Sequence, residues 1–332
     1  MLPCSLRAKP VLLLLLACSV EASFVLSSYA RPRAPALCMN ELSMLQPSTA
    51  ARGAAQAESA ADDAAAEETT AVWTRIRDQA VAASASSPVL APFLESAIHT
   101  HETLPDALAS VLADKIATGA ALPRDLLAEQ LSSLLCEPRT LAALTRDLLA
   151  VVESDPAAPQ LLTVMLHYKG FLALQTYRAA HALWARSAAD EGDVGARQLA
   201  LLLQGRASEL FGVDIHPGAQ IAGGVFLDHA SGVVIGEQAS IGTGCYLLHG
   251  VTLGATGKRD KKTGRRHPAV GAHVTIGLGA SLLGPITVGD GATIGAGAMV
   301  IKDVAAGATV IDKSFMSNTV LKLRGKTAAP VA

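Results

Sequence analysis

The stretch VGAHVTIGLGASLLGPITVGDGATIGAGAMV, residues 270–300, repeats with a period of six residues. An aliphatic residue stands at every sixth position of this stretch: Val270, Ile276, Leu282, Val288, Ile294 and Val300. Such a period fits neither an α-helix nor an alternating strand. It is typical of a parallel β-helix built from hexapeptide repeats, in which short strands stack around a narrow apolar interior.

The same period begins well upstream of this stretch. One series comprises Ile235, Ile241, Leu247 and Leu253, and a second series of small or apolar residues comprises Ile221, Leu227, Val233, Ala239, Cys245 and Val251. Glycines that directly follow repeat positions, such as Gly236 and Gly242, allow the chain to turn between strands. Counting back six residues from Ile235 reaches His229. We therefore expect His229 to occupy a position that later coils fill with Ile or Val.

The composition agrees with a narrow solenoid. Aromatic residues make up 4% of the 332 residues and glycine is plentiful at 28, because Ile, Val and Ala fit such an interior better than rings do. The formal net charge of -2 argues against a general nucleic-acid binder. Of the five cysteines, only Cys136 and Cys245 lie beyond the N-terminal leader, which predicts buried free thiols in a reducing compartment.

The first 70 residues are predicted to lie outside the fold. Arg7 and Lys9 precede an apolar stretch at 11–16, which is the layout of a secretory signal peptide and is too short to span a membrane. The Ala-rich, acidic segment 50–70 then predicts a solvated, disordered linker. We expect the mature chain not to associate with a membrane.

Between these segments lies a second Ser/Arg-rich stretch that has no acidic residue until Glu41 and begins at Ser23 and Phe24. A signal peptide followed by such a stretch resembles the bipartite leaders of algae whose plastids lie behind extra membranes. The resemblance implies delivery to a plastid, and secretion or retention in the endomembrane system is the alternative.

Residues 71–211 show a helical pattern that prolines divide into apolar-periodic segments. Pro88, Pro105, Pro123 and Pro138 mark helix starts, so we expect roughly six to eight helices. The hexapeptide pattern then occupies 212–310, and a tail follows at 311–332. The predicted class is α+β, with an all-helical domain followed by a left-handed parallel β-helix.

The repeat is interrupted between Leu253 and Val270, whose separation is not a multiple of six. A loop must therefore leave the solenoid there, and its sequence GKRDKKTGRRHP at 257–268 carries six basic residues and one acidic residue. Loops on a rigid scaffold often carry function, although solvation alone also explains such a charged loop.

Two short motifs in the first coils combine a histidine with carboxylates: VDIHP at 213–217 and LDHA at 227–230. If stacking of the coils brings Asp214 beside His229, the pair has the arrangement of a general base whose tautomer is fixed by an acidic partner. Taken alone, a histidine in such a position is more often structural.

The order of several motifs resembles that of the serine O-acetyltransferase family. These motifs are DIHP at 214–217, LDHASG at 227–232, VTLGATGK at 251–258 and RHP at 266–268, preceded in the helical region by YKGF at 168–171, ALQ at 173–175 and YR at 177–178. The helical region distinguishes this family from other hexapeptide acyltransferases. The resemblance covers residues from about 72 to 310.

The resemblance implies transfer of an acetyl group from acetyl-CoA to the hydroxyl of L-serine, giving O-acetylserine for cysteine synthesis. His229 would remove the hydroxyl proton during attack on the thioester, because serine's hydroxyl is too weak an acid to ionise unaided. Asp214 would orient His229 and stabilise the imidazolium, as in a catalytic triad.

By the same resemblance, Asp155 and Asp228 would bind the ammonium of serine, and Arg266 with His267 would bind its carboxylate. Without the family match, Asp155 reads more simply as a helix N-cap. For acetyl-CoA, the resemblance points to Gly254, Ala255, Thr256 and Gly277, with the basic loop near its phosphates. No metal is expected.

The resemblance also implies a homotrimer or a dimer of trimers, with active sites between neighbouring solenoids. O-acetylserine sulfhydrylase would be a further partner, which the family binds through its C-terminal tail. Here the family's Gly-x-Pro-Ala-Arg/Lys segment is missing, and the chain reads IDKSFMSN at 311–318 and ends in PVA. These departures argue against that partner and put the closure over acetyl-CoA in question.

Three other functions compete with this interpretation. An acyltransferase acting on a sugar or a different amino acid would not need Asp155, Asp228 and Arg266 together. A γ-type carbonic anhydrase binds zinc through histidines on the same solenoid, but the required His-x4-His pair is absent from this sequence. A non-catalytic scaffold would not need the full set of polar site candidates.

Overall fold

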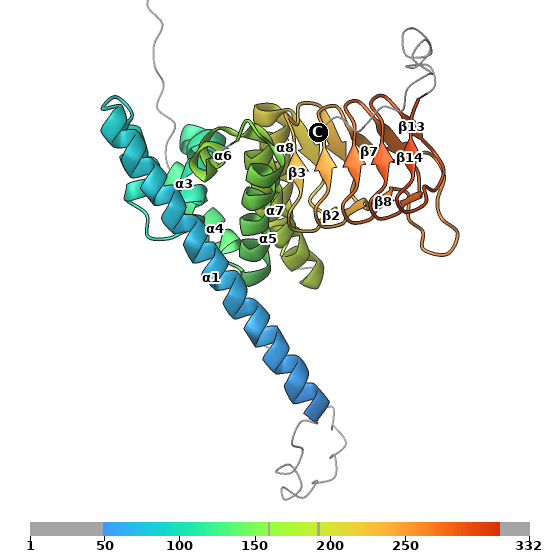
Figure 1. Cartoon of the computed structure of the whole chain (residues 1–332), viewed down its shortest axis with the longest axis horizontal. Coiled ribbons are helices and arrows are strands. Elements are labelled where there is room, and N and C mark those ends of the chain that lie inside the picture. Colours follow the sequence, from blue (N-terminus) through green and yellow to red (C-terminus); the bar gives the residue numbers. More distant parts are fainter. Residues whose placement is uncertain (1–48, 159, 191–192, 313–332) are drawn as a thin grey trace, which may run out of the picture. The chain divides into compact units, whose positions relative to one another are not determined.

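Pro105, Pro123 and Pro138 stand at helix starts as predicted, whereas Pro88 lies in a turn before the short helix at 91–94. The computed structural model of the chain describes residues 49–158, 160–190 and 193–312 (Figure 1). Its helices are α1 Thr49–Ser86, α2 Ala91–Leu94, the π-helix η1 Glu95–His99, α3 Leu104–Ile116, the 3-10 helix η2 Gly119–Ala121, α4 Arg124–Leu135, α5 Pro138–Ser154, α6 Leu161–His167, α7 Lys169–Ala189 and α8 Val194–Phe211. Thr103 caps α3 by accepting a hydrogen bond from Asp106 N at 3.3 Å, and α5 begins at Pro138.

Two expectations about this region need correction. The segment 50–70 was expected to be a disordered linker, but it belongs to α1, because its many alanines favour a helix. Cys136 was expected to be buried, yet it is exposed at the C-terminal end of α4, whereas Cys245 is buried in the solenoid. The leader at 1–48 and the tail at 313–332 lie outside the described residues.

The strands of the solenoid form three parallel sheets. They are β1 Val213–Ile215, β2 Gln220–Ile221, β3 Phe226–Leu227, β4 Val233–Ile235, β5 Ser240–Ile241, β6 Tyr246–Leu247, β7 Thr252–Gly254, β8 Ala269–Val270, β9 Thr275–Ile276, β10 Ser281–Leu283, β11 Thr287–Val288, β12 Thr293–Ile294, β13 Met299–Val300 and β14 Thr309–Val310. We call the sheet β1-β4-β7-β10-β13 sheet A, the sheet β11-β8-β5-β2 sheet B and the sheet β14-β12-β9-β6-β3 sheet C. The predicted parallel β-helix is confirmed.

The strand register shows which coils consist of three hexapeptides and which coil is longer. Val234 pairs with Thr252, eighteen residues later, so that coil contains three hexapeptides. Val213 pairs with Val233, twenty residues later, so the first coil is two residues longer. The loop between β7 and β8, at 255–268, leaves the solenoid as expected.

The two extra residues of the first coil overturn the predicted position of His229. The inward residue before the turn is Leu227, which pairs with Leu247, and the next inward residue is Ala230. His229 lies on the enlarged turn with its side chain 77% exposed and φ of 54°. It therefore does not occupy an inward position of the coil.

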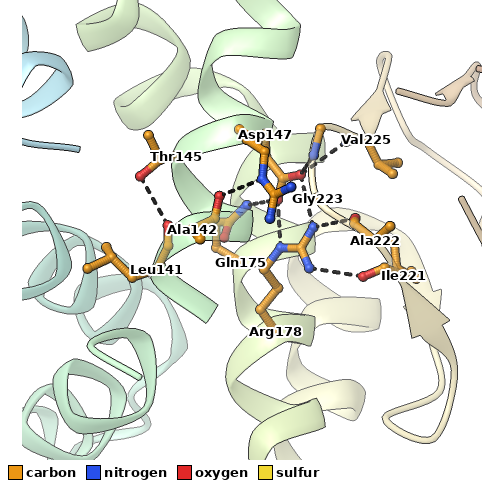
Figure 2. Close-up of polar contacts among 12 residues, drawn as sticks. Leu141, Ala142, Thr145, Asp147, Gln175, Arg178, Ile221, Ala222, Gly223 and Val225 are labelled. Carbon is orange, nitrogen blue, oxygen red and sulfur yellow. Dashed lines mark hydrogen bonds and ion pairs between the residues drawn. The ribbon is translucent and has the colours of Figure 1, made fainter. Parts of the chain in front are cut away.

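A buried ion pair joins the helical domain to the first coil (Figure 2). Arg178 on α7 donates from Nε to Asp147 Oδ2 at 2.6 Å and from Nη2 to Asp147 Oδ1 at 2.9 Å. The same guanidinium donates to the carbonyls of Ile221 and Ala222, while Asp147 accepts from the backbone N–H of Gly224 at 2.8 Å. The pair thus holds α5, α7 and the turn between β2 and β3 together.

The glycine in this turn is required by its conformation. Gly224 has φ of 78°, a region that residues with a Cβ rarely adopt. Its N–H can therefore point at the Asp147 carboxylate, and Val225 N adds a second bond at 3.1 Å. With Gln175 Nε2 also donating at 2.9 Å, both carboxylate oxygens are satisfied in the interior.

Removing the charge of Asp147 should destabilise the protein strongly. In Asp147→Asn the buried Arg178 guanidinium keeps its charge without a counterion, which we expect to lower the free energy of unfolding by about 3–5 kcal/mol. As a control, Arg186→Ala breaks the exposed Arg186–Glu137 pair and should cost less than about 1 kcal/mol. Urea denaturation measures both, and equal losses for the two variants would contradict the proposed importance of the buried pair.

Candidate functional site

A pocket of about 460 Å³ lies where the helical domain meets the enlarged turn of the first coil. Its polar lining consists of Asp155, His167, Tyr168, Lys169, Asp228 and His229. Asp155 follows the last residue of α5, Tyr168 precedes α7, and Asp228 and His229 follow β3. Three of the residues predicted from the sequence therefore meet in one cavity, although they are up to 74 positions apart in the chain.

The turn that carries His229 is conformationally strained. His229 and Ala230 both adopt left-handed φ values, 54° and 59°, which are uncommon for residues with a side chain. The turn is held by Gly232 N, which donates to Gly212 O at 2.7 Å. Strain of this kind persists where the surrounding structure enforces it and is concentrated at functional sites.

The His229 ring is exposed to the pocket and has two neighbours. Its Nε2 lies 3.8 Å from Asp228 Oδ1, and its ring centroid lies 6.0 Å from that of His249, edge to face. Nδ1 of His249 is buried and has no hydrogen-bond partner among the described residues. An imidazole that is accessible at one edge and makes no structural hydrogen bond can accept a proton from a bound molecule.

The two carboxylates of the pocket are each held by a tyrosine. Tyr168 Oη donates to Asp155 Oδ2 at 2.9 Å, and Tyr246 Oη donates to Asp228 Oδ2 at 2.6 Å. Asp155 Oδ1 also accepts from Ala157 N at 2.8 Å. The alternative role of Asp155 as a helix N-cap is wrong, because Asp155 is the C-cap residue of α5 and its contact with Ala157 N closes a local turn.

Burial and the nearby carboxylates keep both phenols protonated. Burial raises the pKa of Tyr168, and Asp155 and then Asp228 raise it further. Burial also raises the pKa of Tyr246, with Asp228 and Asp155 adding to the effect. Each phenol responds to both carboxylates, so the four groups share one electrostatic environment.

Asp214, the predicted partner of His229, lies elsewhere. It points outward from β1 and accepts a hydrogen bond from Gln204 Nε2 on α8 at 2.7 Å. Within the part of the chain that the structure describes, no hydrogen bond or ion pair joins Asp214 to His229. The carboxylate beside His229 in a single chain is Asp228.

Arg266 and His267 also lie away from the pocket, on the loop between β7 and β8. Arg266 Nη2 is 3.9 Å from Glu237 Oε2, and its backbone N–H donates to Gln238 Oε1 at 2.9 Å. His267 is 8% exposed, and its Nδ1 has no partner within the described chain. Burial, followed by the charge of Arg266, lowers the pKa of His267, which favours the neutral ring.

The close approach of His267 to the solenoid depends on a glycine. A Cβ at Gly236 would lie 2.1 Å from Cδ2 of the His267 ring. The basic loop that leads to His267 is also ordered by its own contacts, because Asp260 Oδ1 accepts from Thr263 N at 2.7 Å and Arg265 Nη2 donates to Pro285 O at 3.1 Å.

The residues expected to contact acetyl-CoA fall into two places. Gly254, Ala255 and Thr256 lie at the end of β7, where the basic loop begins. Gly277 lies in the turn after β9, where an added Cβ would be 2.5 Å from Ala296 N of the next coil. Gly277 is therefore required for stacking of the coils, whatever else it contacts.

The site residues thus divide between the two edges of sheet A. Asp228, His229 and Gly277 lie where the chain leaves sheet C and enters sheet A. The residues Gly254, Ala255, Thr256, Arg266 and His267 lie where the chain leaves sheet A and enters sheet B. Sheet A, with Asp214 on its outer face, separates the two groups within one chain.

Two tyrosines that donate to the pocket carboxylates were not predicted as site residues. Tyr168 lines the pocket, whereas Tyr246 reaches Asp228 from outside its lining. A signal was present, because the sequence has only four tyrosines and Tyr246 occupies a position in a strand whose equivalents are small or aliphatic in most coils. Its outward direction brings it onto Asp228, and only the register Phe226↔Tyr246 reveals that contact.

The described residues contain no group of three or more His, Cys, Asp or Glu side chains placed to hold a metal ion. No helix among them is both long and apolar enough to cross a membrane.

Family models match two parts of the chain. The model described as serine acetyltransferase, N-terminal, matches residues 72–176, and the model described as hexapeptide repeat of succinyl-transferase matches residues 269–302. A probable serine acetyltransferase 4 from Oryza sativa subsp. japonica is 46% identical over 260 residues, covering 78% of each chain. The chloroplastic serine acetyltransferase 1 of Arabidopsis thaliana is 43% identical, covering 72% of this chain and 73% of the relative.

Solved structures with similar folds include complexes with small molecules. Soybean serine acetyltransferase complexed with serine matches with a TM-score of 0.68 and 41% identity, covering 74% of this chain and 96% of the soybean chain. Serine acetyltransferase in complex with coenzyme A from Brucella abortus strain S19 matches with a TM-score of 0.66 and 38% identity, covering 72% of this chain and 91% of that chain.

Two helical glycines test the packing that forms the pocket. An added Cβ at Gly170, in the first turn of α7, would lie 2.0 Å from Leu227 O, so Gly170→Ala should lower the free energy of unfolding by about 1–3 kcal/mol. At Gly205 on α8 no atom lies within 4 Å of the added Cβ, so Gly205→Ala should raise the free energy of unfolding by about 0.5–1 kcal/mol. Chemical denaturation of both variants measures these changes. Stabilisation by Gly170→Ala would show that α7 does not contact the first coil as described.

Proposed function

The chain belongs to the serine acetyltransferase family, and from that premise we propose how its residues carry out the reaction. The protein is an acetyl-CoA-dependent acyltransferase that acetylates the hydroxyl of L-serine. The observation that supports the residue roles best is the meeting of Asp155, Asp228 and His229 in one pocket.

The charge of the pocket suits the ammonium of an amino acid. Asp155 and Asp228 bring two carboxylates together, and their hydrogen-bond donors in a single chain are neutral. A bound ammonium would supply positive charge between like charges that otherwise repel. A sugar hydroxyl offers no such charge, so the pocket favours serine over a sugar acceptor.

His229 acts as the general base. With the ammonium at Asp155 and Asp228, the serine hydroxyl extends to the exposed His229 ring, which accepts its proton as the oxygen attacks the thioester carbonyl. The carbon–sulfur bond then breaks, and the CoA thiolate leaves more readily than the serine oxygen, since thiols ionise with a pKa of about 8.5. The proton on His229 can pass to that sulfur, which balances the reaction.

Recognition of the serine carboxylate requires a second copy of the chain. Arg266 and His267 lie at the opposite edge of sheet A from His229, so one chain does not supply both groups. Packing neighbouring solenoids around a threefold axis would bring one edge of sheet A beside the other edge of the next copy. The separation of the two groups within one chain is what supports the homotrimer, or dimer of trimers, expected from the family.

Acetyl-CoA would use the same cleft between copies. Gly254, Ala255 and Thr256 at one edge and Gly277 at the other would line its pantetheine arm, and the basic loop 257–268 would neutralise its phosphates. Asp214 remains the proposed orienting partner of His229, and this role requires the exposed His229 ring to leave its position beside Asp228.

The cellular role follows from the product. O-acetylserine supplies an activated carbon for a sulfhydrylation that yields cysteine. The leader predicts that the acetylation of serine takes place in a plastid. Relatives assigned to chloroplasts and to mitochondria support an organelle location of this activity.

Replacing the general base should greatly slow turnover without unfolding the protein. His229→Asn keeps a residue that tolerates the left-handed backbone, and we expect it to lower kcat by about 10²–10⁴-fold. The measurement is release of free thiol from acetyl-CoA across a panel of small hydroxyl acceptors, including L-serine, L-threonine, L-homoserine and simple sugars.

His273 provides a matched control. It has φ of 55° on another turn of the solenoid, so His273→Asn makes the same change away from the pocket and should retain kcat within about twofold. Near-normal turnover by His229→Asn would rule out the general base, and faster acetylation of a sugar than of serine by the unmodified protein would rule out the substrate.

A further inference from the structure

The two carboxylates of the pocket are held by phenols that come from unrelated parts of the chain. Tyr168 lies at the junction of α6 and α7, and Tyr246 lies on β6 of the second coil. Both side chains are half-buried, and each gives its O–H to one oxygen of one carboxylate. The general-base mechanism above uses neither tyrosine.

Tyr246 is placed by the register of sheet C. Its ring packs against that of Phe226, its register partner in the first coil, with centroids 5.0 Å apart. Leu247, the next residue, points inward and accepts from Asp228 N at 2.8 Å through its carbonyl. The second coil therefore holds Asp228 at two points, through the Leu247 carbonyl and the Tyr246 hydroxyl. The distance of 2.6 Å between Tyr246 Oη and Asp228 Oδ2 is typical of a charge-assisted hydrogen bond.

Tyr168 makes the corresponding contact on the helical side. Its hydroxyl donates to Asp155 Oδ2 at 2.9 Å, while Ala157 N holds Asp155 Oδ1. The carboxylate is thus fixed between the end of α5 and the start of α7. Asp228 Oδ1 keeps no hydrogen bond within the described chain, and it lies 3.8 Å from His229 Nε2.

These contacts oppose the repulsion between the two carboxylates. Without a directed donor, two like charges in one pocket favour rotamers that separate them or bring water between them. A donated O–H compensates charge without placing a cation on the carboxylate, and Lys169, the lysine of the pocket lining, donates to Ser231 Oγ rather than to Asp155 or Asp228. The raised pKa of each phenol means that the O–H is retained through the neutral and mildly alkaline range.

We propose that Tyr168 and Tyr246 are positioning residues for amine recognition, which keep Asp155 and Asp228 directed into the pocket so that a primary ammonium can bridge them. This inference rests on the proposed function, because it concerns the serine side of the site. It assigns the specificity for an α-amino group to four side chains, of which two contact the substrate and two act through those carboxylates.

The test separates binding of serine from the other steps. Tyr246→Phe and Tyr168→Phe keep the rings and remove only the hydroxyls. We expect Tyr246→Phe to raise KM for L-serine by about 5- to 20-fold and Tyr168→Phe, whose bond is longer, by about 3- to 10-fold. In both variants KM for acetyl-CoA and kcat should stay within about twofold, because neither hydroxyl is placed at the thioester.

Tyr177→Phe is the matched control. Its hydroxyl donates to Ala219 O at 2.6 Å in the buried junction between α7 and the solenoid, away from both carboxylates. This variant should lower the thermal midpoint while leaving KM for L-serine unchanged. A purely structural role for Tyr168 and Tyr246 would instead give the same pattern as Tyr177→Phe.

An unchanged or lowered KM for L-serine in both active-site variants would overturn the inference, as would parallel increases in KM for L-serine and acetyl-CoA. Failure of the proposed function is distinguishable, because the unmodified protein would then show no serine-dependent release of thiol.

Discussion

The buried pair of Asp147 and Arg178 is the contact on which the position of the pocket depends. Asp147 lies on α5, whose end leads to Asp155, and Arg178 lies on α7, whose start carries Tyr168. Both are tied to the turn between β2 and β3, directly before the strand that leads to Asp228 and His229. Because each group is buried, the pair is stable only when complete. The helical domain and the solenoid therefore supply the two halves of the proposed amine pocket.

Much of the fold could be predicted from the sequence, because a period of six residues has one common structural explanation. The loop between β7 and β8 was also predictable, since it breaks that period. The prediction for His229 was wrong in its local structure for a specific reason. The two extra residues of the first coil lie between Leu227 and Val233. These two aliphatic residues are still six positions apart, so the insertion leaves no visible break in the six-residue period. The enlarged turn exposes the ring, which is what proton transfer requires.

The site was less accessible to sequence reasoning, because its members meet only through packing. The family resemblance named Asp155, Asp228 and His229, and the structure brings them together. Pairing across coils brings Tyr246 to Asp228, and nothing in the local sequence around either residue indicates that contact. Arg266 and His267 lie at the other edge of sheet A, so a single chain contains the parts of two half-sites. The proposed chemistry is therefore tied to assembly, because the proposed ammonium ligands lie in one pocket of a chain and the proposed carboxylate ligands would come from its neighbour.

A crystal structure of the protein with L-serine and coenzyme A tests this account most directly. We expect the serine nitrogen within about 3.2 Å of carboxylate oxygens of Asp155 and Asp228, and the serine hydroxyl within about 3.2 Å of His229 Nε2. The serine carboxylate should meet Arg266 and His267 of a second copy. Serine bound with its amine away from both carboxylates, or with its hydroxyl directed away from His229, would contradict the account.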